Sequence, residues 1–256
     1  MKLIRFRAGD SVSYGVLEGD DVYPIEGDPF DRYRIDRSSK QALGEVTLLA
    51  PVLPAKVVAV GINYRDHAEE FGHEIPDEPV LFMKPSTAVI GPDDDIVLPA
   101  SSQRVDYEAE LAAVVRKSAR SVSERDAGEY ILGYTCLNDV TARDLQRKDG
   151  QWTRAKSFDT FCPIGPWVQT DLDPNNLAVV SRLNGELRQS SNTAHFIFPL
   201  FRLFSFVSGI MTLLPGDIVT TGTPSGVGAM SPGDLIEVEV EGIGVLKNRV
   251  IAAGQS

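Results

Sequence analysis

The chain has 256 residues, enough for one large domain, or a large domain with a small appendage, and enough to bury a core without disulfide bonds. Its formal net charge is −11, which argues against nucleic acids and anionic membranes as partners. A small anionic substrate is compatible with this charge if a bound metal ion reverses the local field. Cys136 and Cys162 lie in or beside apolar segments and form no zinc-type pair, so we expect a reducing, cytoplasmic location.

Residues 1–50 predict a small N-terminal β module. Three short strand-like segments, at residues 3–6, 13–17 and 22–25, are separated by turns rich in Gly and Asp. The first seven residues alternate apolar and basic side chains, which is typical of a strand and not of a signal peptide. Pro51 and Pro54 then mark a boundary, so we expect residues 51–256 to form the larger domain.

Strand patterns dominate the rest of the chain, and the few helical patterns do not alternate with them. This order predicts an α+β fold and not a doubly wound sheet. The apolar stretch at residues 196–214 is interrupted by Pro199 and Arg202, so it predicts a buried helix and not a membrane span. The predicted strands are residues 57–60, 80–83, 111–115, 131–137, 179–183, 218–221, 235–240 and 244–250.

Two glutamates, Glu108 and Glu110, stand at the start of the apolar strand pattern at residues 111–115. Residues two apart on a strand share a face, roughly 6.5–7 Å from each other. Two carboxylates on one face of an apolar strand need a positive partner. A hard cation such as Mg²⁺ or Ca²⁺ would be suitable, because both ions prefer oxygen ligands. The alternative is an edge strand whose glutamates face water.

Asp139 follows the next apolar run and is a candidate for a third carboxylate at the same cation. The alternative is a loop aspartate that accepts hydrogen bonds from nearby backbone amides. Thr141 and Asp144, three residues apart, resemble a capping box, which predicts a helix that begins at Thr141. Arg143 and Gln146 would then share a face of this helix, where Arg143 offers a planar fork for a carboxylate or forms an ordinary surface pair.

Two further groups of residues could supply proton transfer and charge stabilisation. His67 and Glu70 are three residues apart, and a carboxylate beside a histidine orients the imidazole and raises its basicity. The alternative for this pair is an ordinary contact at the end of a surface helix. Lys156 lies between small residues and Phe158, where a buried ammonium would need a carboxylate or a developing oxyanion; the alternative is a solvated loop lysine.

The segment at residues 221–228 is rich in glycine and includes Thr223. Its glycines permit a concave loop lined by backbone amides, which could hold an anion. It lacks the Gly-Lys-Ser/Thr ending of a nucleotide-binding P-loop.

Five of these motifs occur together and in a fixed order. They are Gly-x-Asn-Tyr-x-x-His at 61–67, Asp-Tyr-Glu-x-Glu-Leu at 106–111, Asn-Asp-Val-Thr-Ala-Arg-Asp-x-Gln at 138–146, Ala-Lys-Ser-Phe-Asp at 155–159 and Thr-Gly-Thr-Pro-x-Gly-Val-Gly at 221–228. In this combination the chain resembles the fumarylacetoacetate hydrolase family. The resemblance extends from residue 51 to about residue 251 and is to the short clade of bacterial isomerases, acylpyruvate hydrolases and oxaloacetate decarboxylases.

The resemblance implies a mixed β-sandwich roll with few helices, a bound Mg²⁺ or Mn²⁺ (with Ca²⁺ as a substitute in crystals) and a homodimer. It also implies a role for each candidate residue. These roles are metal ligands for Glu108, Glu110 and Asp139, an acid/base dyad on a lid for His67 and Glu70, a lysine beside the metal for Lys156, and substrate contacts for Arg143, Gln146 and Thr223.

One departure from the family pattern bears on the substrate. Fumarylacetoacetases carry a further metal-binding aspartate just before their Tyr-x…His element, where this chain has Asn63. We therefore expect a smaller 2-oxo or 2-hydroxy-diene (di)carboxylic acid. An enolate of such an acid leads to C–C hydrolysis, isomerisation or, with a β-carboxylate, decarboxylation. A different class of function, a non-catalytic module held together by the metal, gives no reason for His67, Glu70 and Lys156.

Overall fold

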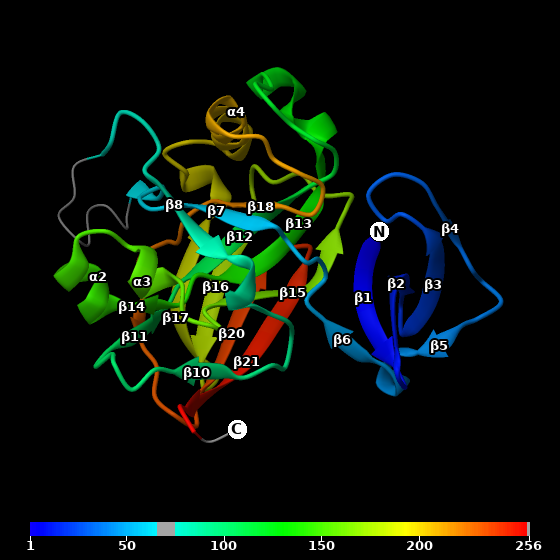
Figure 1. The fold of residues 1–256 in the computed structure, drawn as a ribbon, viewed down its shortest axis with the longest axis horizontal. Coiled ribbons are helices and arrows are strands. Elements are labelled where there is room, and N and C mark those ends of the chain that lie inside the picture. The colour runs from blue at the N-terminus through cyan, green and yellow to red at the C-terminus, as the bar shows by residue number, and fades with distance from the viewer. Residues whose placement is uncertain (66–74, 255–256) are drawn as a thin grey trace.

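A computed structural model describes residues 1–65 and 75–254 (Figure 1). The N-terminal strands form an antiparallel meander in which β1 pairs with both β2 and β6. The three predicted segments fall within β1, β2 and β3. The strands are β1 (Lys2–Ala8), β2 (Ser11–Glu18), β3 (Asp21–Gly27), β4 (Tyr33–Ile35), β5 (Gln41–Ala42) and β6 (Thr47–Leu49).

The meander continues directly into the large sheet, because β1 also pairs with β15. In the described residues this sheet has 13 strands, and its main path is β4-β3-β2-β1-β15-β13-β12-β18-β7-β8. It is mixed, since β18 runs parallel to β7 while most other pairs are antiparallel. Its remaining strands are β7 (Lys56–Val60), β8 (Leu81–Pro85), β9 (Val89–Ile90), β12 (Ala109–Val115), β13 (Ile131–Asn138), β15 (Cys162–Gln169) and β18 (Ile218–Thr220).

The edge of this sheet turns back on itself. After β8, the chain passes through a short turn into β9, which pairs in parallel with β15 near the middle of the sheet. The outer strand β8 is thereby drawn toward the centre, and the sheet rolls around the region in which β12 begins and β13 ends.

A second sheet has the order β10-β21-β20-β16-β17 and packs against the large one (Figure 1). An Asn184-Gly185 turn joins β16 to β17, and both residues have a positive φ, as a tight hairpin turn requires. A small third sheet contains β14, β11 and β19. These strands are β10 (Ile96–Leu98), β11 (Val105–Tyr107), β14 (Thr141–Ala142), β16 (Ala178–Leu183), β17 (Glu186–Asn192), β19 (Gly228–Ala229), β20 (Leu235–Val240) and β21 (Gly244–Ala252).

Strand β12 lies at the centre of the core, and all seven of its residues are buried. Its alternate residues enter two different apolar clusters. Leu111 and Ala113 pack between the two sheets, whereas Ala112 and Val114 pack on the opposite face. A strand that is covered on both faces needs a continuous apolar run, and this explains the pattern at residues 111–115.

The helices in the described part of the chain are α2 (Arg143–Asp149), α3 (Thr153–Lys156) and α4 (Leu200–Ile210), with 3₁₀ turns at Leu43–Glu45, Ser86–Ala88, Glu124–Tyr130 and Thr193–His195. Helix α4 confirms the predicted buried helix, and its Leu203, Phe204 and Val207 face the core. Among the residues described, no helix has both the length and the apolar content needed to span a membrane. The α+β expectation is confirmed.

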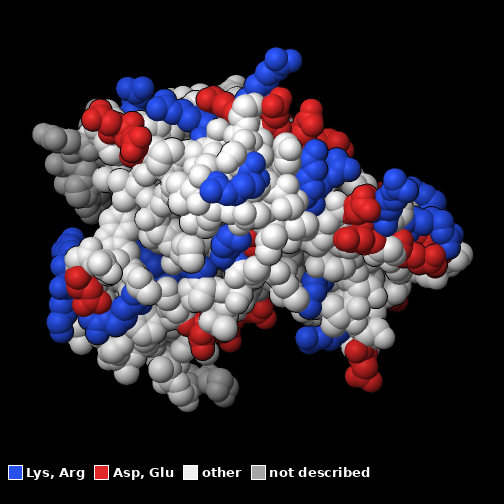
Figure 2. Space-filling view, turned by 45° about the horizontal axis from the view of Figure 1, so that its top comes forward, with Lys and Arg blue, Asp and Glu red and all other residues white. Residues whose placement is uncertain are grey.

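The charged side chains lie mainly at the surface, and both cysteines are buried. On the face seen in Figure 2, acidic and basic side chains are intermixed over the N-terminal strands and along the rim, and the middle is mostly uncharged apart from a few basic side chains. Cys136 and Cys162 are free and belong to different core clusters, so they do not form a metal-binding pair. Burial raises the pKa of each thiol to about 12, which keeps both protonated at neutral pH.

Candidate active site

The three carboxylates that were predicted as metal ligands meet at one point. Glu108 occupies the break between β11 and β12, where the chain passes from the small sheet into the large one. Its backbone carbonyl accepts a hydrogen bond from the Asp139 amide at 2.9 Å, which joins the start of β12 to the end of β13. Carboxylate oxygens of Glu108, Glu110 and Asp139 all lie within 4.8 Å of one another.

All three residues are buried, with exposed fractions of 5%, 1% and 1% for Glu108, Glu110 and Asp139. The alternative of glutamates that face water therefore does not apply. Three carboxylates that lie so close together and are shielded from solvent require positive charge nearby.

Two of the three carboxylates form ion pairs with cationic side chains. Lys156, which is 2% exposed, donates from Nζ to Oε2 of Glu108 at 2.8 Å and to Oδ2 of Asp139 at 2.5 Å. Arg143 donates to the other oxygen of Glu108, and Lys84 donates to the other oxygen of Asp139 at 2.5 Å. Burial alone would lower the pKa of Lys156, but the charges of Asp139 and Glu108 outweigh it and raise that pKa. Lys156 is thus not the solvated loop lysine of the alternative.

Glu110 differs from its two neighbours. Its Oε2 accepts the backbone N–H of Gly222 at 3.0 Å, but within residues 1–65 and 75–254 no Lys, Arg or His forms an ion pair with it. Burial, and after it the charge of Asp139, raises the pKa of Glu110 well above its usual value. A divalent cation among the three carboxylates would provide the missing positive partner. The donor set, all oxygen and all acidic, fits Mg²⁺ or Mn²⁺.

Arg143 and Gln146 lie beside the carboxylates, on α2. Arg143 is 7% exposed; its Nε donates to Asp106 at 2.9 Å and its Nη1 donates to Gln146 Oε1 at 2.7 Å. Asp106 also accepts from Arg104 at 2.8 Å. Asp106 and Gln146 therefore hold the guanidinium on two sides, and its remaining nitrogen, Nη2, donates to Glu108. A buried guanidinium with three partners is not an ordinary surface pair.

The predicted start of α2 is wrong by two residues. The helix begins at Arg143, because Thr141 and Ala142 pair with β11 as strand β14. The Thr141 hydroxyl donates to the Asp139 carbonyl at 2.8 Å, and Asp144 accepts from Ser102, so neither side chain caps the helix. Pairing with a distant strand has overridden the local capping pattern.

The glycine-rich loop is fixed to the start of β12. Thr223 Oγ1 donates to the Ala109 carbonyl at 2.9 Å. Gly222 has a φ of +79°, and a Cβ there would lie 3.0 Å from the Cβ of Asn63, so the loop needs glycine at this position. The Asn63 amide donates to the Thr221 carbonyl at 2.8 Å. Asn63 is therefore a structural brace behind the loop.

His67 and Glu70 lie outside the described residues. Their proposed pairing and the lid on which they are expected remain predictions from the sequence.

Two residues of this region have no counterpart among the sequence predictions, namely Lys84 and Gln189. The predicted strand at residues 80–83 stops just short of Lys84, whose only signal is its alternation with Phe82 on an otherwise apolar strand. Gln189 lies on β17, in the other sheet, and nothing in its local sequence points to the site.

Gln189 is fully buried and makes four hydrogen bonds. Its Oε1 accepts from the Ala109 amide at 3.0 Å and from Ser181 at 2.9 Å, and its Nε2 donates to Thr223 and to the Pro224 carbonyl, both at 2.8 Å. It thereby ties the second sheet to the two segments that carry Glu110 and Gly222.

We expect Gln189→Leu to lower the free energy of unfolding by several kcal/mol, because each buried polar group left unpaired costs about 1–3 kcal/mol. Urea denaturation would measure the change. Gln169→Leu is the control, since the Gln169 amide is partly exposed and makes one 3.5 Å contact. Equal stability of the two variants would contradict a bracing role for Gln189.

Comparison with known proteins agrees with this geometry. The family described as Fumarylacetoacetate (FAA) hydrolase C-terminal matches residues 56–251, and the family described as Rv2993c-like, N-terminal matches residues 1–51. The chain is 46% identical over 220 residues to oxaloacetate tautomerase FAHD2B, mitochondrial, from Bos taurus, which covers 81% of this chain and 70% of that protein.

Two solved structures extend the comparison. 5-Carboxymethyl-2-hydroxymuconate delta-isomerase from Mycobacterium smegmatis has a TM-score of 0.93 and 46% identity, over 98% of this chain and 100% of that chain. Maleylpyruvate hydrolase from Sphingobium sp. SYK-6, in complex with manganese(II) ion and pyruvate, has a TM-score of 0.81 and 31% identity, over 98% of this chain and 99% of that chain. The roll expected from the motifs is confirmed, and the chain belongs to the fumarylacetoacetate hydrolase family.

Proposed function

We propose that this protein is a divalent-metal-dependent enzyme that acts through an enolate on a small 2-oxo or 2-hydroxy-diene (di)carboxylic acid, by C–C bond hydrolysis or isomerisation. The observation that carries the proposal is Glu110, a buried carboxylate without a cationic partner among the described residues, between two carboxylates that have such partners. The similarity to a hydrolase solved with manganese(II) and pyruvate supports both the metal and the substrate class.

The charge of the site favours an anionic substrate. Among the described residues, four buried carboxylates and three buried cations form the site, so its formal charge is −1. A divalent cation reverses this to +1, and a carboxylate substrate that becomes an enolate is attracted to it. These residues are Asp106, Glu108, Glu110, Asp139, Lys84, Arg143 and Lys156.

The residues around the carboxylates have different roles toward the substrate. When bound by Glu108, Glu110 and Asp139, Mg²⁺ or Mn²⁺ supplies Lewis-acid stabilisation of negative charge on a substrate oxygen. Lys156 is held beside the carboxylates by two hydrogen bonds and donates to the oxygen on which the enolate charge develops. The ring of Phe82, 4.8 Å from the Lys156 ammonium, keeps that side of the site apolar.

Substrate orientation and proton transfer are assigned to the remaining residues. Arg143, with Gln146 beside it, binds the substrate carboxylate through its planar guanidinium, and Thr223, whose hydroxyl is bonded to the start of β12, is a further substrate contact. His67, oriented by Glu70, moves a proton or activates water. In hydrolysis, activated water adds to the carbonyl carbon next to the scissile bond, the C–C bond breaks with its electron pair leaving as the enolate, and the enolate is then protonated. Without water, a proton removed from the substrate to form the enolate is returned at another carbon, which is isomerisation.

A second candidate is an oxaloacetate-type tautomerase or decarboxylase. The similarity to an oxaloacetate tautomerase over 81% of this chain favours it. Stabilisation of an enolate accounts for both outcomes. When CO₂ leaves a β-carboxylate, the electron pair of the broken C–C bond becomes an enolate that is then protonated, and tautomerisation removes a proton from carbon and returns one to oxygen.

A substrate panel tests the proposal. Acylpyruvates, oxaloacetate and 2-hydroxy-diene-dioates would be incubated with the purified protein and Mg²⁺ or Mn²⁺, with Glu108→Gln as the inactive control. We expect turnover of at least one class, which a chelator abolishes. If no class is turned over while a chelator lowers the melting temperature, the metal has a structural role and the proposal is wrong.

A further inference from the structure

Lys84 stands at an unusual position for a residue that contacts the carboxylate centre. It belongs to β8, the edge strand of the large sheet, and three strands separate β8 from β13. Yet its Nζ donates to Oδ1 of Asp139 at 2.5 Å and to the Val140 carbonyl at 3.2 Å, just beyond the end of β13. Lys84 is fully buried. These two bonds span the concave side of the rolled sheet.

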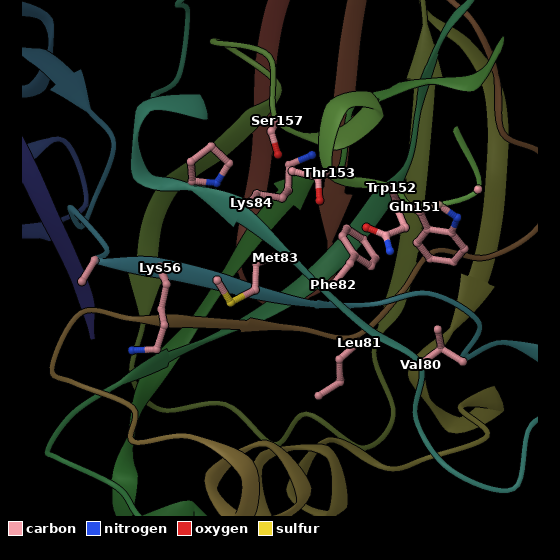
Figure 3. A pocket seen from close by; sticks show the side chains of 13 residues that line it. Lys56, Val80, Leu81, Phe82, Met83, Lys84, Gln151, Trp152, Thr153 and Ser157 are labelled. Atoms are coloured by element: carbon pink, nitrogen blue, oxygen red, sulfur yellow. The ribbon is translucent and has the colours of Figure 1, made fainter. Parts of the chain in front are cut away.

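The surroundings of Lys84 separate its ammonium from solvent. Figure 3 shows Lys84 and Phe82 on one side of β8, whereas Leu81 and Met83 point to the other. Phe82 packs edge-on against Trp152, with ring centroids 5.3 Å apart. Lys84, Phe82 and Trp152 also contribute to the lining of an open groove of about 750 Å³, but the Lys84 side chain itself has no exposed surface. Little water can therefore replace Asp139 as the partner of the Lys84 ammonium.

The effect on Asp139 is geometric. One ammonium binds each carboxylate oxygen, Lys84 at Oδ1 and Lys156 at Oδ2. Opposed bonds of this kind fix the rotation of the carboxylate about its terminal bond, which otherwise has a broad range. The orientation of Asp139 toward Glu108 and Glu110 is then set by the protein before any cation binds.

We propose that Lys84 is a positioning residue, which holds Asp139 in the orientation needed to bind a divalent cation together with Glu108 and Glu110. This inference rests on the metal site of the proposed function. Loss of a partner that orients a metal ligand typically weakens metal binding by about 10–100-fold. A lysine that acted only as a nearby positive charge would oppose the cation, and its removal would strengthen binding. Whether the loss of Lys84 weakens or strengthens cation binding therefore distinguishes a positioning residue from a nearby positive charge.

The test uses Co²⁺, whose visible spectrum reports the ligand arrangement, and titrates it into wild-type protein and Lys84→Met. We expect about 10–100-fold weaker binding and an altered Co²⁺ spectrum in the variant. Lys56→Met is the matched control. Lys56 lies on the neighbouring strand β7, lines the same groove and pairs with fully buried Asp217, away from the carboxylates. It should lose stability but keep wild-type Co²⁺ affinity and spectrum.

Each outcome decides the question. Unchanged or tighter Co²⁺ binding by Lys84→Met overturns the positioning role, and equal weakening in Lys56→Met assigns the effect to general destabilisation. Wild-type protein that binds no Co²⁺ contradicts the proposed metal site itself. If Lys84→Met does not fold, Lys84→Gln, which keeps a donor but not the charge, should show the same weakening. Failure of both to fold, with Lys56→Met folded, would make Lys84 a purely structural residue.

Discussion

Replacing Glu110 by glutamine is expected to abolish metal binding and activity and, at the same time, to make the metal-free protein more stable. The glutamine oxygen can still accept the Gly222 amide, so the contact at 3.0 Å is retained. What disappears is a buried charge without a cationic partner among the described residues. Metal affinity should fall by more than about 100-fold, beyond the effect of losing an outer partner.

The stability gain should depend on pH in a defined direction. The pKa of Glu110 is raised by burial, so the folded protein binds this proton more tightly than the unfolded chain does. Below its ordinary pKa of 4.5, Glu110 is protonated in both the folded and the unfolded chain, so it does not lower the free energy of unfolding. As the pH rises from 4.5 through the raised pKa of the folded state, the free energy of unfolding decreases. The advantage of Glu110→Gln in thermal unfolding, measured with chelator present, should widen as the pH increases across that window.

Glu108→Gln is the matched control, because it removes a carboxylate of the same centre that has two cationic partners. It leaves Arg143 and Lys156 with less negative charge around them, so it should destabilise the metal-free protein. If both variants shift the melting temperature in the same direction, the difference between the two glutamates is not electrostatic.

Lys156→Met is expected to reduce kcat by roughly 10²–10³-fold when the metal concentration is high enough to saturate the site despite the lost bond to Asp139, since one donor to a developing oxyanion has an effect of this size. The variant should fold, because Arg143 still pairs with Glu108 and Lys84 still pairs with Asp139. Steady-state kinetics on the best substrate of the panel would measure the change.

A rise in KM with unchanged kcat would instead show that Lys156 binds the ground state and the transition state equally well. Lys117→Met provides the control. Lys117 is half exposed and lies 3.7 Å from Glu129, so both kinetic constants should match those of the wild-type protein.

Local patterns predicted most of the fold and the three carboxylates of the centre. The apolar run of β12 identified a doubly covered strand, and Glu108, Glu110 and Asp139 stood out as carboxylates next to apolar runs. Each of these features depends on only a few consecutive residues, so it can be predicted from the sequence alone.

The remaining features depend on pairs of segments that are distant in the chain. Lys84 reaches Asp139 only because the sheet rolls, and Gln189 reaches Ala109 from the other sheet. The same cause made the predicted helix start at Thr141 wrong, since pairing with β11 took precedence over a local cap. Local periodicity carries no information about such contacts.

The wide separation of these contacts along the chain has a consequence for folding kinetics. The bonds that surround the carboxylates join residues 55, 48 and 80 positions apart, so no short fragment of the chain contains all the partners that form the centre. Contacts of such long range form late and slowly. In refolding experiments, recovery of cation affinity should therefore follow the recovery of secondary structure and coincide with the final cooperative phase. Cation binding would then report that the chain has formed its native topology.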